Sequence, residues 1–298
     1  MSPRAAVHDT PHPHAYDPAV FSAAYERVLG KWPAPHSSVT VPTPFGATHV
    51  NVCGPADGPP VLLLPGGGGA TSAPWYAQAA ALSLTRRVHA VDLIGAPGRS
   101  VPDPGRGPRT LDDLMGWLGS VLDGLGLGSA EVDLIGHSYG AWIALHHALR
   151  TPARTRRLVL LDPTQCFAGF RPVYLLRALP MLLRPTPRRV RAFLEWESGG
   201  ADTLDPDCLA LQEAAARFPA LRPATGPRPA PDALSAFTSP ALILFAGAAK
   251  VHDARELAAT ARESMPEATV KVLPGIAHHA LPPALPEATN HLIARFLD

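Results

Sequence analysis

The chain has 298 residues, of which 46% are hydrophobic and 17% charged, and its formal net charge is +1. This length is enough for one large α/β domain or two smaller ones, and the composition is typical of a soluble globular protein. A charge this close to zero gives no electrostatic basis for binding nucleic acid.

Residues 1–18 lack the apolar core of a signal peptide, and we expect them to form a disordered tail. The longest apolar runs, such as Ala241–Ala249, are too short to span a bilayer. The sequence therefore predicts a cytoplasmic protein whose partners include neither nucleic acid nor a membrane.

Metal sites and disulfides are not expected. Three cysteines lie at wide, irregular spacings without a C-x-x-C motif: Cys53, Cys166 and Cys208. Three histidines lie between prolines of the tail and are interpreted as solvated rather than as metal ligands: His8, His12 and His14. We therefore predict that the protein works without a metal or an organic cofactor.

The first third of the chain begins with an expected helix over Ala19–Trp32. Strand candidates follow at Ser38–Val41, Thr48–Cys53, Val61–Leu64 and Val88–Leu93. Asp92, near the end of the last of these, is interpreted as bracing its loop rather than as a catalytic acid. Thr110 is expected to cap the next helix.

Four consecutive glycines, Gly66–Gly69, follow the strand Val61–Leu64 and Pro65. A phosphate-binding P-loop would end in Gly-Lys-Ser/Thr, and a dinucleotide site would have G-x-G-x-x-G at the start of a helix; neither pattern is present. The better interpretation is an oxyanion loop, in which backbone N–H groups must approach a developing negative charge without side chains in the way.

The stretch Glu131–Leu149 contains the most informative motif. A buried strand leads into Gly-His-Ser-Tyr-Gly, which is followed by a run with helical periodicity. This strand–G-x-S-x-G–helix arrangement is the nucleophile elbow, and it makes Ser138 the candidate nucleophile. Side chains at Gly136 and Gly140 would collide with neighbouring backbone in so sharp a turn.

After a strand at Leu158–Leu161, residues 167–240 lose strand patterning. They contain helical pieces broken by prolines, at Val173–Leu183, Val190–Trp196 and Leu209–Phe218, and we interpret them as an inserted helical cap. A core of residues 19–166 and 241–298 then alternates strands and helices, which predicts an α/β fold with a mostly parallel sheet covered on both faces.

A serine nucleophile needs a base to accept its proton and an acid to orient that base. His278 follows the last expected strand, Thr269–Leu273, on a Pro-Gly loop, where it could reach Ser138. His279 is the neighbouring alternative, but only one of two consecutive side chains can point inward.

From these residues, 19–298 resemble the α/β-hydrolase superfamily, most of all its carboxylesterase-type members with a helical cap. The resemblance rests on the glycine loop, residues 92–100, the elbow and the loop 274–278. It implies Ser138 as nucleophile, His278 as general base, and an oxyanion hole formed by the N–H groups of Tyr139 and Gly67. Pro65 stands where the family usually has histidine.

The acid departs from the family pattern. The family usually has Asp or Glu three residues after the glycine that ends the seventh strand. Here that glycine is Gly247 and the third residue on is Lys250, whose ammonium cannot accept a hydrogen bond from the imidazole N–H. Asp162, at the end of the sixth strand, is favoured over Asp253, whose D-x-x-E context predicts a helix cap. A third possibility is a Ser–His dyad without an acid.

The sequence thus predicts a serine hydrolase that cleaves an apolar carboxylic ester or thioester. Expected substrate contacts are Gly68, Phe167, Tyr174 and Trp196. The alternatives are a biosynthetic enzyme on the same fold, catalysing acyl transfer, C–C cleavage or cyclisation, and a non-catalytic ligand-binding protein.

Overall fold

A computed structural model describes residues 16–298. The three tail histidines and most of the predicted tail lie outside these residues. Tyr16 packs edge-on against Phe218, and Asp17 accepts hydrogen bonds from the backbone N–H groups of Ala19 and Val20, which caps the first helix.

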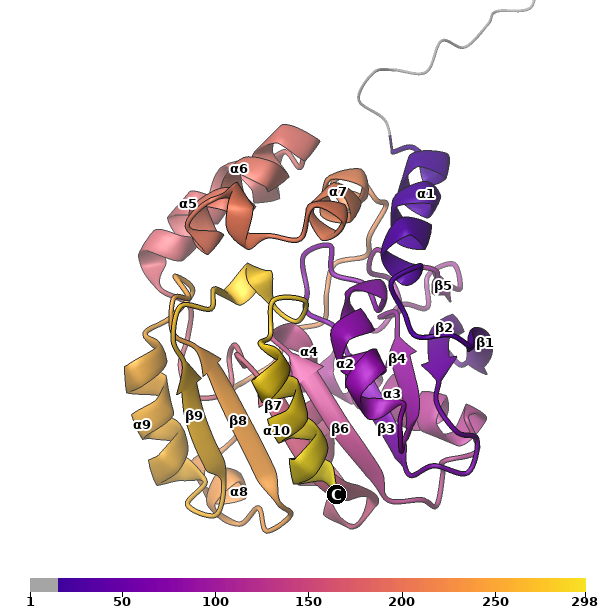
Figure 1. The fold of residues 1–298 in the computed structure, drawn as a ribbon, viewed down its shortest axis with the longest axis vertical. Coiled ribbons are helices and arrows are strands. Elements are labelled where there is room, and N and C mark those ends of the chain that lie inside the picture. Colours follow the sequence, from indigo (N-terminus) through magenta and orange to yellow (C-terminus); the bar gives the residue numbers. More distant parts are fainter. Residues whose placement is uncertain (1–15) are drawn as a thin grey trace, which may run out of the picture.

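A mostly parallel sheet runs through the centre of the molecule (Figure 1) in the order β1-β2-β4-β3-β6-β7-β8-β9, with β5 paired to β2. The first pairings, β1 with β2 and β2 with β4, are antiparallel, and all pairings from β4 to β9 are parallel. The strands are β1 His36–Thr43, β2 Gly46–Cys53, β3 Pro60–Leu64, β4 Arg87–Val91, β5 Val101–Pro102, β6 Val132–His137, β7 Thr155–Leu161, β8 Ala241–Ala246 and β9 Thr269–Leu273. The predicted fold class is confirmed; among the strands, only the two-residue β5 was not expected.

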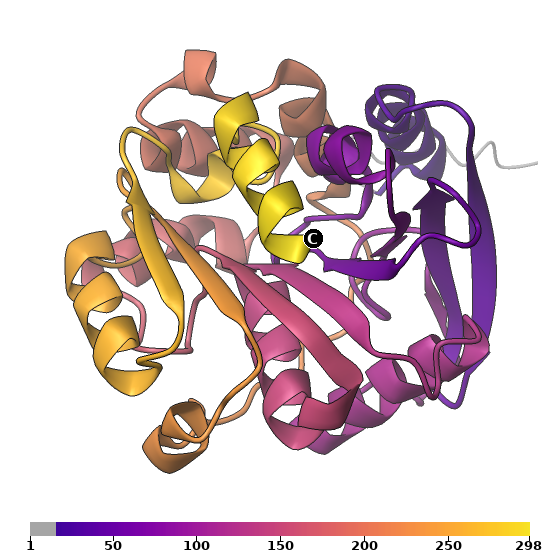
Figure 2. The same cartoon turned by 60° about the horizontal axis from the view of Figure 1, so that its bottom comes forward.

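Alternate residues of the central strands point to opposite sides of the sheet, and both sets are apolar. Helices therefore cover both faces. On one face, Leu62 and Leu64 belong to a single core cluster with residues of α3 (Leu111–Gly124), α4 (Tyr139–Arg150) and α9 (Ala254–Ser264). On the other face, Val61 and Leu63 share a second cluster with residues of α1 (Pro18–Leu29), α2 (Tyr76–Leu82) and α10 (Glu287–Leu297). Figure 2 shows the two layers, with yellow α10 and purple α2 on one side and magenta α3 and α4 on the other.

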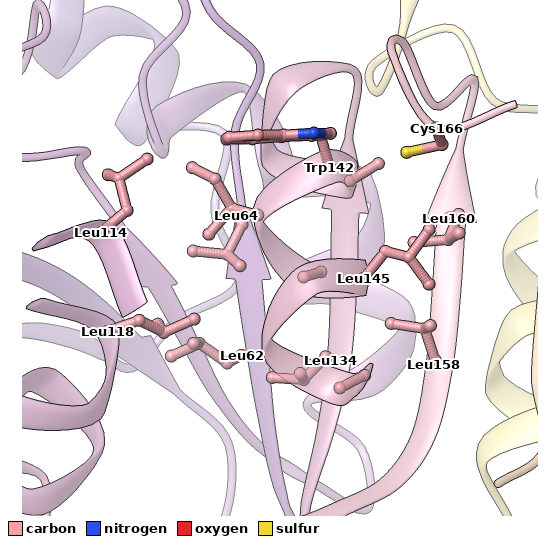
Figure 3. Packing of buried hydrophobic residues seen from close by; sticks show 14 of the residues in the cluster. Leu62, Leu64, Leu114, Leu118, Leu134, Trp142, Leu145, Leu158, Leu160 and Cys166 are labelled. Atoms are coloured by element: carbon pink, nitrogen blue, oxygen red, sulfur yellow. The ribbon is translucent and has the colours of Figure 1, made fainter. Parts of the chain in front are cut away.

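The core beneath α4 fixes the helix that follows the candidate nucleophile. Trp142 and Leu145 of α4 lie over Leu64, Leu134 and Leu160 of three adjacent strands (Figure 3), and all five are nearly inaccessible to solvent. Burying side chains of this size stabilises the fold by about 1.5–3 kcal/mol each. The N-terminus of α4 is therefore held rigidly at the carboxyl end of β6.

A separate layer of helices lies over the carboxyl ends of the parallel strands (Figure 1). It consists of α5 (Pro172–Leu183), α6 (Pro187–Ser198) and α7 (Pro206–Ala215), each with proline in its first turn, where a missing N–H has no cost. After α7 the chain returns to the core: Ala224 and Phe237 are buried there, and α8 (Pro231–Ser235) packs on α9.

None of the helices within residues 16–298 combines the length and the apolar character needed to traverse a lipid bilayer.

Candidate active site

Ser138 occupies a strained turn between β6 and α4. Its backbone has φ 53° and ψ −114°, a conformation that L-residues rarely adopt. A Cβ atom at Gly136 would lie 2.4 Å from the Gly140 carbonyl oxygen, and one at Gly140 would lie 2.3 Å from the Leu64 carbonyl oxygen. The predicted need for glycine at both positions is confirmed, since only glycine lets the turn pack this tightly.

A continuous chain of hydrogen-bond contacts joins Ser138, His278 and Asp162. His278 Nε2 lies 2.9 Å from Ser138 Oγ, and His278 Nδ1 lies 2.6 Å from Asp162 Oδ2. The three residues are 8%, 3% and 0% exposed, in the order serine, histidine, aspartate. An ionised carboxylate only accepts hydrogen bonds, so Nδ1 carries a proton and Nε2 faces the serine hydroxyl as the acceptor.

The neighbouring His279 points away from the serine. Its Nε2 lies 2.9 Å from the Tyr174 hydroxyl, and burial lowers its pKa to about 4. In the short η4 turn, His278–Ala280, the imidazole of His278 therefore points to Ser138 and that of His279 points to α5.

Asp162 is held from several directions at the end of β7. Its Oδ1 accepts a hydrogen bond from the Ala246 N–H at 2.8 Å and a second from His252 Nε2, also at 2.8 Å. His252 is 3% exposed and was not singled out in the sequence. The one available signal was its place in the loop after β8, two residues beyond Lys250, where the family usually supplies the acid.

These contacts shift the pKa values of His278 and Asp162. Burial disfavours protonation of His278, but its hydrogen bond to Asp162 and the negative charge there outweigh burial and raise the pKa of His278. Burial also disfavours ionisation of Asp162, yet hydrogen bonds from His252 and His278 hold its pKa far below the ordinary value. Asp162 is therefore an anion at neutral pH.

Lys250 and Asp253 take no part in this chain of contacts. The Lys250 ammonium donates to the Trp196 carbonyl oxygen and lies 4.9 Å from the centre of the Trp196 ring. Asp253 Oδ1 accepts from the backbone N–H groups of Arg255 and Glu256, at 3.0 and 3.1 Å, as the N-cap of α9. The predicted capping role is confirmed.

Glu197 of α6 ties together the two loops on which His252 and His278 lie. Its side chain is fully buried, and its two carboxylate oxygens accept the backbone N–H groups of Lys250 and His279, each at 3.0 Å. The helical layer therefore fixes both loops through one carboxylate.

The glycine loop approaches the elbow from the adjacent strand. Tyr139 is the first residue of α4, so its backbone N–H has no acceptor within the helix. A Cβ at Gly67 would lie 3.5 Å from the Tyr139 Cβ, and Gly68 and Gly69 have φ of 68° and 108°. The two predicted oxyanion-hole residues therefore lie side by side next to Ser138.

Asp92 braces this edge of the sheet, as predicted. Its Oδ1 accepts from the Ser72 N–H and hydroxyl at 2.8 and 2.7 Å, and its Oδ2 accepts from the Arg99 N–H at 2.8 Å and the Tyr25 hydroxyl at 3.0 Å. These contacts hold the loops after β3 and β4 together and attach them to Tyr25 of α1.

A cavity opens beside Ser138, between the glycine loop and α7. Its apolar and weakly polar lining comes from α7 and from the chain after η4: Cys208, Leu211, Gln212, Leu281, Pro282 and Pro283. The predicted substrate contacts lie elsewhere. Phe167 packs edge-on against Phe245 in the core, Tyr174 and Trp196 pack against Phe193 within the helical layer, and Gly68 lies on the loop without lining the cavity. The aromatic side chains of the layer form its own small core.

Residues 16–298 contain no group of three or more His, Cys, Asp and Glu side chains arranged to hold a metal ion.

The sequence profile of the alpha/beta hydrolase family matches residues 61–292, and the chain belongs to that family. It is 34% identical over 186 residues to carboxylesterase YbfK of Bacillus subtilis, and 34% identical over 182 residues to the uncharacterized carboxylesterase nap of the same organism. These alignments cover 62% and 61% of this chain and 60% and 58% of the two relatives, so the chain spans about three fifths of their length.

A solved structure extends the likeness. The crystal structure of naproxen esterase (carboxylesterase NP) from Bacillus subtilis matches with a TM-score of 0.85 and 27% identity, over 94% of this chain and 98% of that one. The resemblance predicted from the glycine loop, the elbow and the histidine loop is confirmed: the chain is a carboxylesterase-like α/β hydrolase.

Proposed function

We propose that this protein is a serine esterase that hydrolyses carboxylic esters through an acyl-enzyme on Ser138. The observation that carries the proposal is the unbroken series of contacts from the Ser138 hydroxyl through His278 to Asp162. A raised pKa on His278 fits a group that must take up a proton during the reaction.

In the proposed reaction, Ser138 Oγ attacks the ester carbonyl carbon while His278 Nε2 accepts the hydroxyl proton. The backbone N–H groups of Tyr139 and Gly67 stabilise the negative oxygen of the tetrahedral intermediate. The C–O bond to the alcohol then breaks, and His278 donates its proton to the leaving alcohol. Water attacks the acyl-enzyme in the same way and releases the carboxylic acid and free Ser138.

The cavity supports an apolar substrate. Leu211, Leu281 and Pro283 offer hydrophobic surface, and Gln212 offers an amide that can accept or donate a hydrogen bond. An ester with a hydrophobic acyl or alcohol group and few polar substituents would suit this lining. A thioester of the same shape would meet the same groups, and α5–α7 would act as the cap over it.

A fluorophosphonate probe tests the nucleophile. It should label wild-type protein once, at Ser138, and leave Ser138→Ala unlabelled. Hydrolysis of short and medium p-nitrophenyl esters should be lost in the same variant. Labelling that persists in Ser138→Ala, or a wild type that neither labels nor hydrolyses any ester or thioester, would refute the proposal.

The sequence also allowed a non-catalytic binding protein, mainly because of Lys250. That alternative loses its support, because Asp162 provides the carboxylate that Lys250 cannot, and the Lys250 ammonium points to Trp196. An acyl-transferase would label with the probe as well, but its acyl-enzyme would react faster with an added alcohol or amine than with water.

A further inference from the structure

Helix α5 carries a large apolar surface that no other part of the described chain covers. Six of the eleven exposed large hydrophobic side chains within residues 16–298 belong to this one helix, and they are between 44% and 72% exposed. We call them the α5 outer face: Val173, Leu175, Leu176, Leu179, Leu182 and Leu183. Soluble proteins rarely keep so many large hydrophobic side chains together in water without a use for them.

The geometry of the helix explains why this face stays open. Tyr174, Ala178 and Met181 recur at helical spacing and pack with α6, so they form the inner side. The α5 outer face occupies the opposite half of the same helix. In Figure 1, α5 lies beside α6 in the layer over the carboxyl ends of the strands.

The segment that contains the α5 outer face is positively charged, which favours a negatively charged partner. Residues 163–194 contain six arginines and no acidic residue, in a chain whose net charge is only +1. Within residues 16–298, Arg177, Arg184 and Arg188 form no ion pair; the Arg177 guanidinium lies 5.6 Å from the Trp196 ring centre. Arg189 donates to the carbonyl oxygens of Pro180 and Arg184 at the end of α5.

A second copy of the chain fits this surface poorly, because pairing two α5 outer faces would bring two sets of unpaired arginines together. A partner must offer both a broad apolar layer and negative charge beside it. The surface of an anionic lipid bilayer has both, with acyl chains for leucines and phosphate headgroups for arginines.

We propose that the α5 outer face docks this protein onto anionic lipid bilayers. The helix lies in the plane of the interface with its leucines among the upper acyl carbons, and Arg184 and Arg188 contact the headgroups. The sequence predicted no membrane partner because no segment can span a bilayer, but peripheral docking needs no spanning segment. The proposal does not depend on esterase activity.

Co-sedimentation with lipid vesicles tests it. Wild-type protein is mixed with vesicles of phosphatidylcholine alone and with vesicles of equal parts phosphatidylcholine and phosphatidylglycerol. We expect partitioning onto the anionic vesicles that weakens as salt is added. The double variant Leu176→Asp/Leu183→Asp should partition at least about tenfold more weakly. Arg184→Gln/Arg188→Gln should bind more weakly and with less salt dependence.

Leu84→Asp is the matched control, because Leu84 is 81% exposed and lies outside α5. It should partition like wild type, and circular dichroism should show all variants folded. Three outcomes would overturn the proposal: wild type that stays in solution with both vesicle types, leucine variants that sediment as wild type does, or a lipid-free dimer that Leu176→Asp/Leu183→Asp converts to monomer. The last would assign the face to a second copy.

Discussion

His252 and Asp162 form a buried pair in which the imidazole Nε2 lies 2.8 Å from the carboxylate Oδ1. The other carboxylate oxygen, Oδ2, accepts from His278. The Asp162 carboxylate is therefore hydrogen-bonded to two imidazoles. One of them, His278, faces Ser138, whereas His252 packs edge-on against Phe245. We infer that His252 is a positioning residue, which acts on the proposed base His278 through the carboxylate of Asp162.

Removal of His252 should change the pH dependence of catalysis. Without this donor, the charge on Asp162 falls more fully on His278, whose pKa is already raised, so that pKa should rise further. The reaction needs neutral His278, so the acidic limb of kcat/KM should move to higher pH in His252→Leu. A shift on the order of one pH unit is expected, since a hydrogen bond to a charged group contributes about 1.5–3 kcal/mol.

His252→Gln provides the control, because its side-chain amide can still donate to Oδ1. In this variant the acidic limb of the kcat/KM profile should lie at nearly the same pH as in wild type. If both variants lower the melting temperature while the limb stays in place, His252 supports the fold and does not tune the base.

Replacement of the two candidate acids should cause failures of different kinds. Asp162→Asn loses the charge that orients and stabilises protonated His278, and turnover should fall by up to about four orders of magnitude. Asp253→Asn keeps a side chain that can cap α9, so it should lose at most about 1 kcal/mol of stability and retain its rate. Ester hydrolysis and thermal melting of both variants measure the two effects. Full activity in Asp162→Asn would point to a Ser–His dyad.

The sequence allowed the prediction of Ser138 because the elbow is a local motif, written within one strand, one turn and one helix. Asp162 could be found by excluding Lys250 and by its position at a strand end. His252 could not be found, because its contact joins residues 90 positions apart and depends on β7 and β8 being neighbours in the sheet. The contact between His252 and Asp162 cannot be predicted until the strand order is known.

The predicted substrate contacts lie away from the cavity for a different reason. Tyr174 and Trp196 are aromatic residues of predicted cap helices, and sequence periodicity does not say which side of such a helix faces the site. The structure turns them toward Phe193 and gives the cavity wall to Leu211 and Gln212 of α7 instead. The short elements β5 and α2 went unpredicted because two and seven residues carry little periodicity.

Stability should fall as the pH drops below about 6.5, because several histidines are buried without charge. Burial lowers the pKa of His89, His147 and His279 to about 4 in the folded protein. Between the unfolded and folded pKa values the unfolded chain binds more protons, so each residue removes up to about 1.4 kcal/mol per pH unit. His278, with its raised pKa, acts in the opposite direction at pH values between its unfolded and its folded pKa.

Urea denaturation at about pH 8, 6.5 and 5 measures this trend. His147→Gln should lose less stability than wild type between the upper and the lower pH, since it has no proton to take up. A free energy of unfolding that stays constant over this range would show that these histidines are accessible to protons in the folded state.

The elbow glycines should not tolerate alanine, unlike a glycine on an open helix surface. Gly140 lies in α4, where alanine would ordinarily favour the helix by about 0.5–1 kcal/mol. Its Cβ, however, would lie 2.3 Å from the Leu64 carbonyl oxygen and 2.4 Å from that of Pro65. Both are backbone atoms that cannot move without shifting β3 and the glycine loop. Gly140→Ala should therefore be destabilised by several kcal/mol or fail to fold.

Gly116→Ala is the matched control. Gly116 lies in helix α3, and a methyl group added there would meet no neighbouring group within 4 Å. This variant should therefore melt at a higher temperature than wild type. Thermal unfolding of the pair separates the two effects, and a Gly140→Ala protein as stable as wild type would mean that the turn around Ser138 is looser than these distances require.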